Sequence, residues 1–313
     1  MRLGFFLPQI GPWAGADSIA RVGARAEDLG FDSVWTTERL LFPLEPTAPY
    51  PVADGRIPEV YKTSLDPLDS LTFVAGQTTR VRLGVSVLNL PWYNPVLLAR
   101  RLTTLDVLSD GRLSVGFGIG WSPEEHAAAG SDWHVRGKRS DEALDVLKAI
   151  WTTDPVEFHG RFFQVPRSVI GPKPVQTPHP PIYMAAYMPA ALDRVARQAN
   201  GWNPVGIPPA GVAEMFAGIR AMAQEAGRDP SELELIMRAN AEVTEQALGD
   251  ERASFCGTPE QIAADVAATV EIGADELIFD ATFDPAVRSA DDIVERMELF
   301  MRLAKESLSS SPA

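Results

Sequence analysis

The sequence has a single cysteine, few lysines and no long apolar run, and each of these shortages excludes a class of protein. Cys256 has no second thiol to pair with, which rules out an internal disulfide framework and a cluster of cysteine metal ligands. No stretch reaches the roughly 18 apolar residues that a membrane-spanning helix requires. Residues 1–8 also lack the long apolar stretch of a signal peptide. We therefore expect a soluble, cytoplasmic protein without a membrane partner.

Basic side chains are scarce as well: 28 lysines and arginines face 42 acidic residues, for a net charge of −14. This balance argues against a nucleic-acid partner. The acidic excess lies late in the chain, because residues 1–219 carry 20 basic and 22 acidic side chains and residues 220–313 carry 8 and 20. A polyanionic ligand is therefore expected to bind the first two-thirds of the chain, where the net charge is close to zero.

Several catalytic motifs are also missing. The sequence contains no phosphate-binding Walker A loop and no G-x-S-x-G nucleophile elbow. Its histidines are isolated and lack the H-E-x-x-H pairing of zinc sites. We expect all four on the surface or in loops, and we predict no metal site; they are His126, His134, His159 and His179.

Apolar strand-like runs alternate with amphipathic helical runs along the chain, which is typical of βαβ units around a parallel sheet. Caps mark the helix starts: Asp17, Asp66 before Pro67, Asn94 before Pro95, and Thr258 before Pro259. Gly30 is expected to end the first helix in the left-handed conformation. The expected strands lie at 3–8, 33–37, 82–90, 113–120, 181–186, 202–205, 233–243 and 275–280.

Eight strand–helix units in 313 residues predict the α/β class and a (β/α)8 TIM barrel, with residues 1–313 forming a single domain. A doubly wound open sheet is the alternative. The turn pair His159-Gly160 between aromatic-rich runs predicts a hairpin at 156–165, inserted after the fourth helix.

In a barrel, catalytic residues lie on the loops that follow the strands. Glu38 and Arg39 follow the strand expected at 33–37. Glu38 could act as a general acid or base, with Arg39 binding an anion. The alternative is an ordinary ion pair within the loop. Ser86 and Asn89 interrupt the apolar run at 82–90, so they either face a ligand or make local hydrogen bonds.

Two further strand ends carry weaker signals. The alternating glycines Gly116, Gly118 and Gly120 allow a ligand to approach the backbone closely, although their spacing is not that of a dinucleotide-binding loop. Pro189 starts a helix directly after the strand at 181–186, and free N–H groups at a helix start bind phosphate.

Longer segments resemble a known family. They are Phe31-Asp32-Ser33-Val34-Trp35, Leu83-Gly84-Val85-Ser86-Val87, Asn94-Pro95, the run from Leu105-Asp106 through Ser109-Asp110-Gly111-Arg112-Leu113 to Gly120-Trp121, Asn200-Gly201-Trp202, and Gly257-Thr258-Pro259-Glu260. Together they resemble the luciferase-like monooxygenase family, and within it the branch that uses the deazaflavin coenzyme F420. The resemblance implies a (β/α)8 barrel, a homodimer, and hydride transfer between the deazaflavin C5 and an organic small-molecule substrate.

The resemblance also implies roles for matching positions. The Ser86–Val87 bond matches a non-prolyl cis peptide that forms a bulge behind the deazaflavin ring, and Asn89 matches a position that touches the ring. The segment that runs along the cofactor corresponds to Ile119, Gly120 and Trp121. The segment whose N–H groups hold the phosphate corresponds to Ala185, Ala186, Tyr187 and Met188.

The sequence departs from the family after the strand at 33–37. Many members have Asp-His there, and the histidine works near the transferred hydride, whereas this chain has Glu38-Arg39. Arginine stays protonated, so it cannot shuttle a proton, but it can stabilise developing negative charge. The loop at 38–65 is an expected lid, and we expect an aromatic substrate wall from Trp13, Trp92, Tyr93 and Trp121.

Three alternatives stay open. The first is an FMN-dependent two-component monooxygenase on the same barrel, which would receive reduced flavin and consume oxygen. The second is a barrel glycosidase that uses Glu38 together with Glu124 or Asp280. The third is a non-catalytic cofactor carrier, which the loss of the family histidine makes reasonable.

Overall fold

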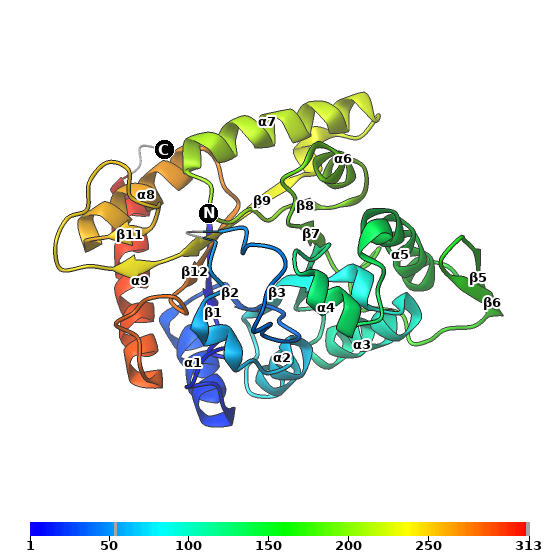
Figure 1. The fold of residues 1–313 in the computed structure, drawn as a ribbon, viewed down its shortest axis with the longest axis horizontal. Helices are drawn as coiled ribbons and strands as arrows, with labels where there is room; N and C mark the ends of the chain where they lie inside the picture. The colour runs from blue at the N-terminus through cyan, green and yellow to red at the C-terminus, as the bar shows by residue number, and fades with distance from the viewer. Residues whose placement is uncertain (53–54, 311–313) are drawn as a thin grey trace.

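A closed barrel of parallel strands lies at the centre of the computed structural model, which describes residues 1–52 and 55–310 (Figure 1). Around the barrel the order is β1-β12-β9-β8-β7-β4-β3-β2. The strands are β1 (Arg2–Phe6), β2 (Ser33–Thr36), β3 (Arg82–Asn89), β4 (Leu113–Gly118), β7 (Ile182–Met184), β8 (Gly201–Trp202), β9 (Glu234–Asn240) and β12 (Glu276–Asp280). The predicted (β/α)8 barrel is confirmed, and the open sheet is wrong.

Helices cover the outside of the barrel (Figure 1). They are α1 (Ala16–Leu29), α2 (Pro67–Ala75), α3 (Pro95–Leu108), α5 (Arg136–Thr152), α6 (Pro189–Gln198), α7 (Pro209–Glu225), α8 (Pro259–Glu271) and α9 (Ala290–Ser310). The short helix α4 (Pro123–Ala128) lies in the connection after β4. Within the described ranges, no helix is both long and apolar enough to cross a membrane.

The hairpin predicted at 156–165 is present as β5 (Val156–His159) and β6 (Gln164–Ser168), an antiparallel pair that follows α5, the fourth long helix. Figure 1 shows it projecting from the side of the barrel. A second small pair consists of β10 (Glu242–Val243) and β11 (Cys256–Gly257). Single 3-10 turns occur at Glu59–Lys62, Leu90–Trp92, Trp133–Val135 and Pro230–Glu232.

Most of the predicted helix caps are confirmed. The side chains of Asp66, Asn94 and Thr258 accept hydrogen bonds from the first-turn N–H groups of their helices, and Gly30 ends α1 with φ 89°. Asp17 is the exception, because Gly15 holds the cap position of α1 without a side-chain hydrogen bond. Asp17 instead lies in the first turn of α1, where its negative charge interacts favourably with the positive end of the helix dipole.

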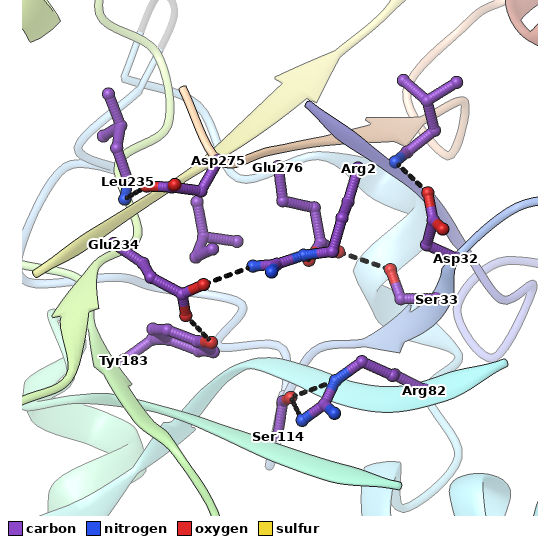
Figure 2. Close-up of polar contacts among 12 residues, drawn as sticks. Arg2, Asp32, Ser33, Arg82, Ser114, Tyr183, Glu234, Leu235, Asp275 and Glu276 are labelled. Atoms are coloured by element: carbon purple, nitrogen blue, oxygen red, sulfur yellow. Dashed lines mark hydrogen bonds and ion pairs between the residues drawn. The ribbon is translucent and has the colours of Figure 1, made fainter. Parts of the chain in front are cut away.

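The end of the barrel at which the strands begin is closed by polar contacts (Figure 2). Arg2 pairs with Glu276 at 3.1 Å and with Glu234 at 2.8 Å. Glu276 also accepts hydrogen bonds from Ser33 and from the indole of Trp35. The Glu276 carboxylate satisfies several buried donors, so this network stabilises the barrel. The opposite end, where the strands finish, is the end at which barrels bind ligands.

Candidate active site

A cavity of about 530 Å³ opens where the barrel strands end. This volume lies within the range of cofactor and substrate pockets. Its walls come from the strands β3 and β9 and from the loops after β2, β4, β7 and β8. The lining residues are Thr37, Glu38, Arg39, Tyr50, Pro51, Val52, Tyr61, Ser86, Val87, Asn89, Trp121, Ala185, Tyr187, Asn203, Val205, Gly206, Ile207 and Arg238.

Glu38 is a buried carboxyl group at the edge of this cavity. Its Oε2 accepts hydrogen bonds from the backbone N–H of Asn89 at 2.6 Å and from the Asn89 side chain at 3.3 Å. The hydroxyl of Tyr93 donates to Oε1. Burial raises the pKa of Glu38 to about 7, although these hydrogen bonds oppose the shift. The carboxyl group can therefore hold or release a proton near neutral pH.

The raised pKa of Glu38 predicts a stability that depends on pH. Between pH 4.5 and about 7 the unfolded chain ionises this carboxyl group while the folded protein keeps it protonated. The free energy of unfolding should therefore fall by about 3 kcal/mol as the pH rises through this window. Urea unfolding at a series of pH values measures the loss, and Glu38→Gln should remove it. An equally steep loss in the Gln variant would contradict the assignment to Glu38.

Arg39 forms a buried ion pair with Glu125 of α4, with Nη2 and Oε2 2.5 Å apart. Its guanidinium group lies 4.9 Å from the ring centroid of Trp121 and 5.0 Å from that of Tyr61. Burial raises the pKa of Glu125 even though the charge of Arg39 opposes the shift. The ion pair and the two rings fix the guanidinium group against the cavity wall.

The two adjacent glutamates of α4 hold the loop at 38–65. Glu125 accepts hydrogen bonds from the backbone of Leu40 and Leu41, and Glu124 accepts two from Thr47. Burial alone would raise the pKa of Glu124, but the hydrogen bonds from Thr47 and Ser122 lower it to about 2. This anchoring places the loop residues Tyr50, Pro51 and Val52 in the cavity wall.

The β3 wall of the cavity contains an irregular segment. The Ser86–Val87 peptide bond is cis, and the register of β3 against β4 shifts between Val85 and Leu88, which is the bulge that the resemblance implies. Ser86 Oγ donates to Asn203 at 2.6 Å, and Arg238 donates to the Ser86 carbonyl oxygen at 3.0 Å. The bulge is therefore held by side chains from the far side of the barrel.

Arg238 itself is held by a buried carboxylate. Its Nη2 lies 2.5 Å from Asp280 Oδ2, and its guanidinium group lies 4.2 Å from the ring centroid of Phe6. Asp280 does not line the cavity, and neither does Glu124, whose carboxylate is bound to Thr47 and Ser122. Within residues 1–52 and 55–310, Glu38 therefore has no carboxylate partner facing it across the cavity, so the geometry does not support the glycosidase alternative.

The glycines at the end of β4 have a different role from the one predicted. A Cβ atom at Gly116 would lie 2.2 Å from the Val85 carbonyl oxygen, and one at Gly118 would lie 2.7 Å from Val87 Cγ2. Neither glycine lines the cavity. The missing side chains make room for the bulge of β3, so the prediction that they admit a ligand is wrong for this pair.

Most of the residues predicted for the site meet at the cavity. Glu38, Arg39 and six of the cofactor-binding candidates line it, namely Ser86, Val87, Asn89, Trp121, Ala185 and Tyr187. The other four candidates do not line the cavity themselves: Gly120, Ala186 and Met188 are adjacent in sequence to lining residues, and Ile119 lies two positions before Trp121.

The start of α6 offers donors for an anion. Among the described residues, none accepts a hydrogen bond from the backbone N–H of Tyr187 or Met188, which precede this helix. Tyr187 lines the cavity, and Met188 is exposed. A phosphate group at the cavity mouth would satisfy these donors, so the chain fits a phosphorylated cofactor with a ring system against β3.

His126 is not the surface or loop residue that we expected. It is fully buried in α4, where its ring nitrogens contact the Ile119 carbonyl oxygen at 3.0 Å and Ser131 Oγ at 3.2 Å. Its ring packs between Trp92 and Trp133. The histidine thus supports the backbone behind Trp121. No group of three or more possible metal ligands occurs in the described ranges.

The aromatic wall differs in part from the prediction. Trp121 lines the cavity, whereas Trp13, Trp92 and Tyr93 do not. The lining residues that were not predicted from the sequence include Tyr50, Tyr61, Asn203 and Arg238. Arg238 could have been predicted from the sequence, because it is a charged residue within the apolar run of β9.

The chain is similar in sequence to members of a known family. A family model described as luciferase-like monooxygenase matches residues 1–247. The chain is 31% identical over 214 residues to an uncharacterized protein of Mycobacterium tuberculosis, an alignment that covers 67% of this chain and 73% of the relative.

Two relatives with described activities match shorter segments. The chain is 30% identical over 192 residues to an F420-dependent glucose-6-phosphate dehydrogenase of Amycolatopsis mediterranei, covering 60% of this chain and 53% of the relative. It is 34% identical over 153 residues to an FMNH2-dependent dimethylsulfone monooxygenase of Pseudomonas putida, covering 48% and 42%. The chain thus spans about half the length of these two proteins.

Solved structures show the same fold. The monooxygenase RslO1 from Streptomyces bottropensis superimposes with a TM-score of 0.77 at 24% identity, covering 98% of this chain and 100% of that one. The coenzyme F420-dependent tetrahydromethanopterin reductase from Methanopyrus kandleri gives a TM-score of 0.76 at 17% identity, covering 97% and 98%.

Proposed function

Because this chain belongs to the luciferase-like monooxygenase family, we propose that it transfers a hydride between C5 of the deazaflavin coenzyme F420 and an organic substrate. One observation carries the proposal: the bulge at Ser86–Val87 and the pair Glu38-Arg39 line the same cavity. The relative that uses F420 supports the choice of cofactor. The cofactor would supply the hydride chemistry, and the protein would supply orientation and charge.

The cofactor would lie along the β3 wall of the cavity. Val87 and Asn89 would contact the ring system, and Trp121 would lie beside it with the backbone of Ile119 and Gly120. The segment Ala185, Ala186, Tyr187 and Met188 would hold the phosphate through its N–H groups. Support for this placement comes from the lining of the cavity and from the N–H groups before α6 that have no acceptor among the described residues.

Glu38 and Arg39 would act at the reacting edge. Arg39 keeps a positive charge at the cavity wall, which would stabilise negative charge as it develops during transfer. Glu38 is buried, and its pKa of about 7 would let it hold a proton beside Asn89. Together they would take the place of the Asp-His pair of other family members.

An FMN-dependent two-component monooxygenase is the second candidate, favoured by the relative that uses FMNH2. Anaerobic mixing of the protein with reduced F420 and a pool of organic acceptors tests the first proposal through return of the oxidised deazaflavin absorbance. Oxygen uptake with reduced FMN tests the second. Turnover with reduced FMN alone would overturn the F420 proposal, and cofactor binding without turnover in either assay would leave a non-catalytic carrier.

We further propose that the chain forms a homodimer. Large apolar side chains are exposed on neighbouring helices at the barrel surface, with Phe73 on α2 and Leu97 and Leu108 on α3. A second copy would cover them.

A further inference from the structure

Two tyrosine hydroxyls meet in the wall of the cavity, where the ring of Tyr50 also packs against Trp121. Tyr50 comes from the loop held by α4, and Tyr61 comes from the 3-10 turn at Glu59–Lys62. Their hydroxyl oxygens lie 3.1 Å apart, and both residues line the cavity. Tyr61 is buried and Tyr50 is half-buried, so the pair connects the interior of the site to its rim.

One of the two hydroxyl hydrogens of the pair is not used in the hydrogen bond between them. Two phenol hydroxyls carry two hydrogens, and the bond between them uses one. Among the described residues, no third group accepts the other hydrogen. Among the other hydroxyls that line the cavity, Ser86 donates to Asn203 and Tyr187 donates to the Val205 carbonyl oxygen, whereas the Thr37 hydroxyl also lacks an acceptor among the described residues. At this pair a ligand in the cavity therefore meets a hydroxyl hydrogen that has no acceptor among the described residues.

The surroundings keep this donor protonated and favour negative charge beside it. Burial and the neighbouring Tyr50 raise the pKa of Tyr61 well above its usual range, although the charges of Arg238 and Arg39 oppose the shift. The Arg39 guanidinium group lies 5.0 Å from the Tyr61 ring centroid. Neutral donors beside fixed cations are the arrangement that stabilises an oxygen on which charge develops.

We propose that the hydroxyl pair Tyr50–Tyr61 binds and protonates the carbonyl oxygen of the substrate, so that the substrate class is a ketone, an aldehyde or an enone. This inference rests on the proposed hydride transfer and adds the residues that receive the substrate oxygen. It also supplies the proton donor that Arg39 cannot be.

The step balances in atoms and electrons. When the carbonyl carbon, or the β-carbon of an enone, accepts a hydride from the reduced deazaflavin, a new C–H bond forms and the π electrons move to the carbonyl oxygen. The oxygen takes the proton of the tyrosine hydroxyl, which gives an alcohol from a ketone or aldehyde and an enol from an enone. The phenolate regains a proton from water at the half-buried Tyr50. The substrate is reduced by two electrons and the deazaflavin is oxidised by two.

The variants Tyr50→Phe and Tyr61→Phe test the inference, because each removes only a hydroxyl group. The probes are cyclohexanone, benzaldehyde and cyclohex-2-en-1-one, with reduced F420 in anaerobic single turnovers. We expect the wild type to reduce at least one probe and each variant to be slower by about 100-fold, the usual contribution of a positioned acid. The dissociation constant of F420 should change less than twofold.

A second readout does not depend on turnover. Carbonyl-labelled cyclohexanone bound with oxidised F420 cannot react, and its C=O stretching frequency reports hydrogen bonds to the oxygen. We expect a higher frequency in each Phe variant than in the wild type. Tyr183→Phe is the matched control, because this hydroxyl donates to Glu234 at the closed end of the barrel. The control should keep the wild-type rate and frequency.

The outcomes separate the inference from the proposed function. If F420 does not bind to the wild-type protein, the proposed function fails and the inference fails with it. If F420 binds and no carbonyl probe is reduced, the inference is overturned while the cofactor assignment stands. Phe variants with wild-type rates and an unshifted carbonyl frequency would likewise overturn it.

Discussion

Arg39→Ala is expected to slow hydride transfer by about 100- to 1000-fold while F420 still binds. Removal of one donor that stabilises developing charge has an effect of this size in other enzymes. The variant should also lose about 3–5 kcal/mol of unfolding free energy, because Glu125 stays buried without its cation. Single-turnover kinetics measures the first effect, and urea unfolding measures the second.

The double variant Arg39→Met with Glu125→Met separates the two effects. It removes the whole buried ion pair and leaves no unpaired charge, so we expect most of the lost stability to return. The slow hydride transfer should persist, because the positive charge at the cavity wall is still missing. A double variant that regains the wild-type rate would show that Arg39 only holds the loop, and its assignment to the reaction would be wrong.

Gly116→Ala is expected to destabilise the protein by about 3 kcal/mol or more. The added methyl group would lie 2.2 Å from the Val85 carbonyl oxygen, so β3 must move away from β4. This movement displaces Ser86 and Val87 in the cavity wall, and F420 binding should weaken at the same time. Thermal unfolding and a cofactor titration of the same preparation measure the two effects.

Gly218→Ala is the matched control, because Gly218 lies within α7 and its Cβ would meet no atom within 4 Å. Alanine is the better helix former, so this variant should gain about 0.5–1 kcal/mol. A Gly116→Ala protein as stable as the wild type would mean that β3 and β4 are not packed as closely as described.

The fold could be predicted because its signals are local. Asp66, Asn94 and Thr258 each cap a helix through N–H groups two or three residues ahead, so the helix starts are readable from short windows. The ends of β2 and β3 are also readable from the sequence, which is why Glu38 and Asn89 could be predicted as site residues, whereas β8 ends at Trp202 and not at 205. Asp17 failed as a cap because the tertiary path places Gly15 at that position.

The missed part of the site depends on contacts between distant residues. Tyr50 reaches the cavity because Thr47 is bound to Glu124, and these residues are 77 positions apart. His126 is buried because Trp92 and Trp133 pack against its ring, and neither contact has a sequence pattern. The role of the β4 glycines likewise depends on another strand, since the bulge that fills their space belongs to β3.

Titration of the purified protein with F420, and separately with FMN, tests the central claim most directly. Trp121 lines the cavity, so tryptophan fluorescence reports occupancy, and a Trp121→Phe protein should show a smaller change. We predict saturable quenching by F420 with a dissociation constant of about 1 μM or less, and much weaker binding of FMN. Tighter binding of FMN, or no binding of either cofactor, would contradict the account.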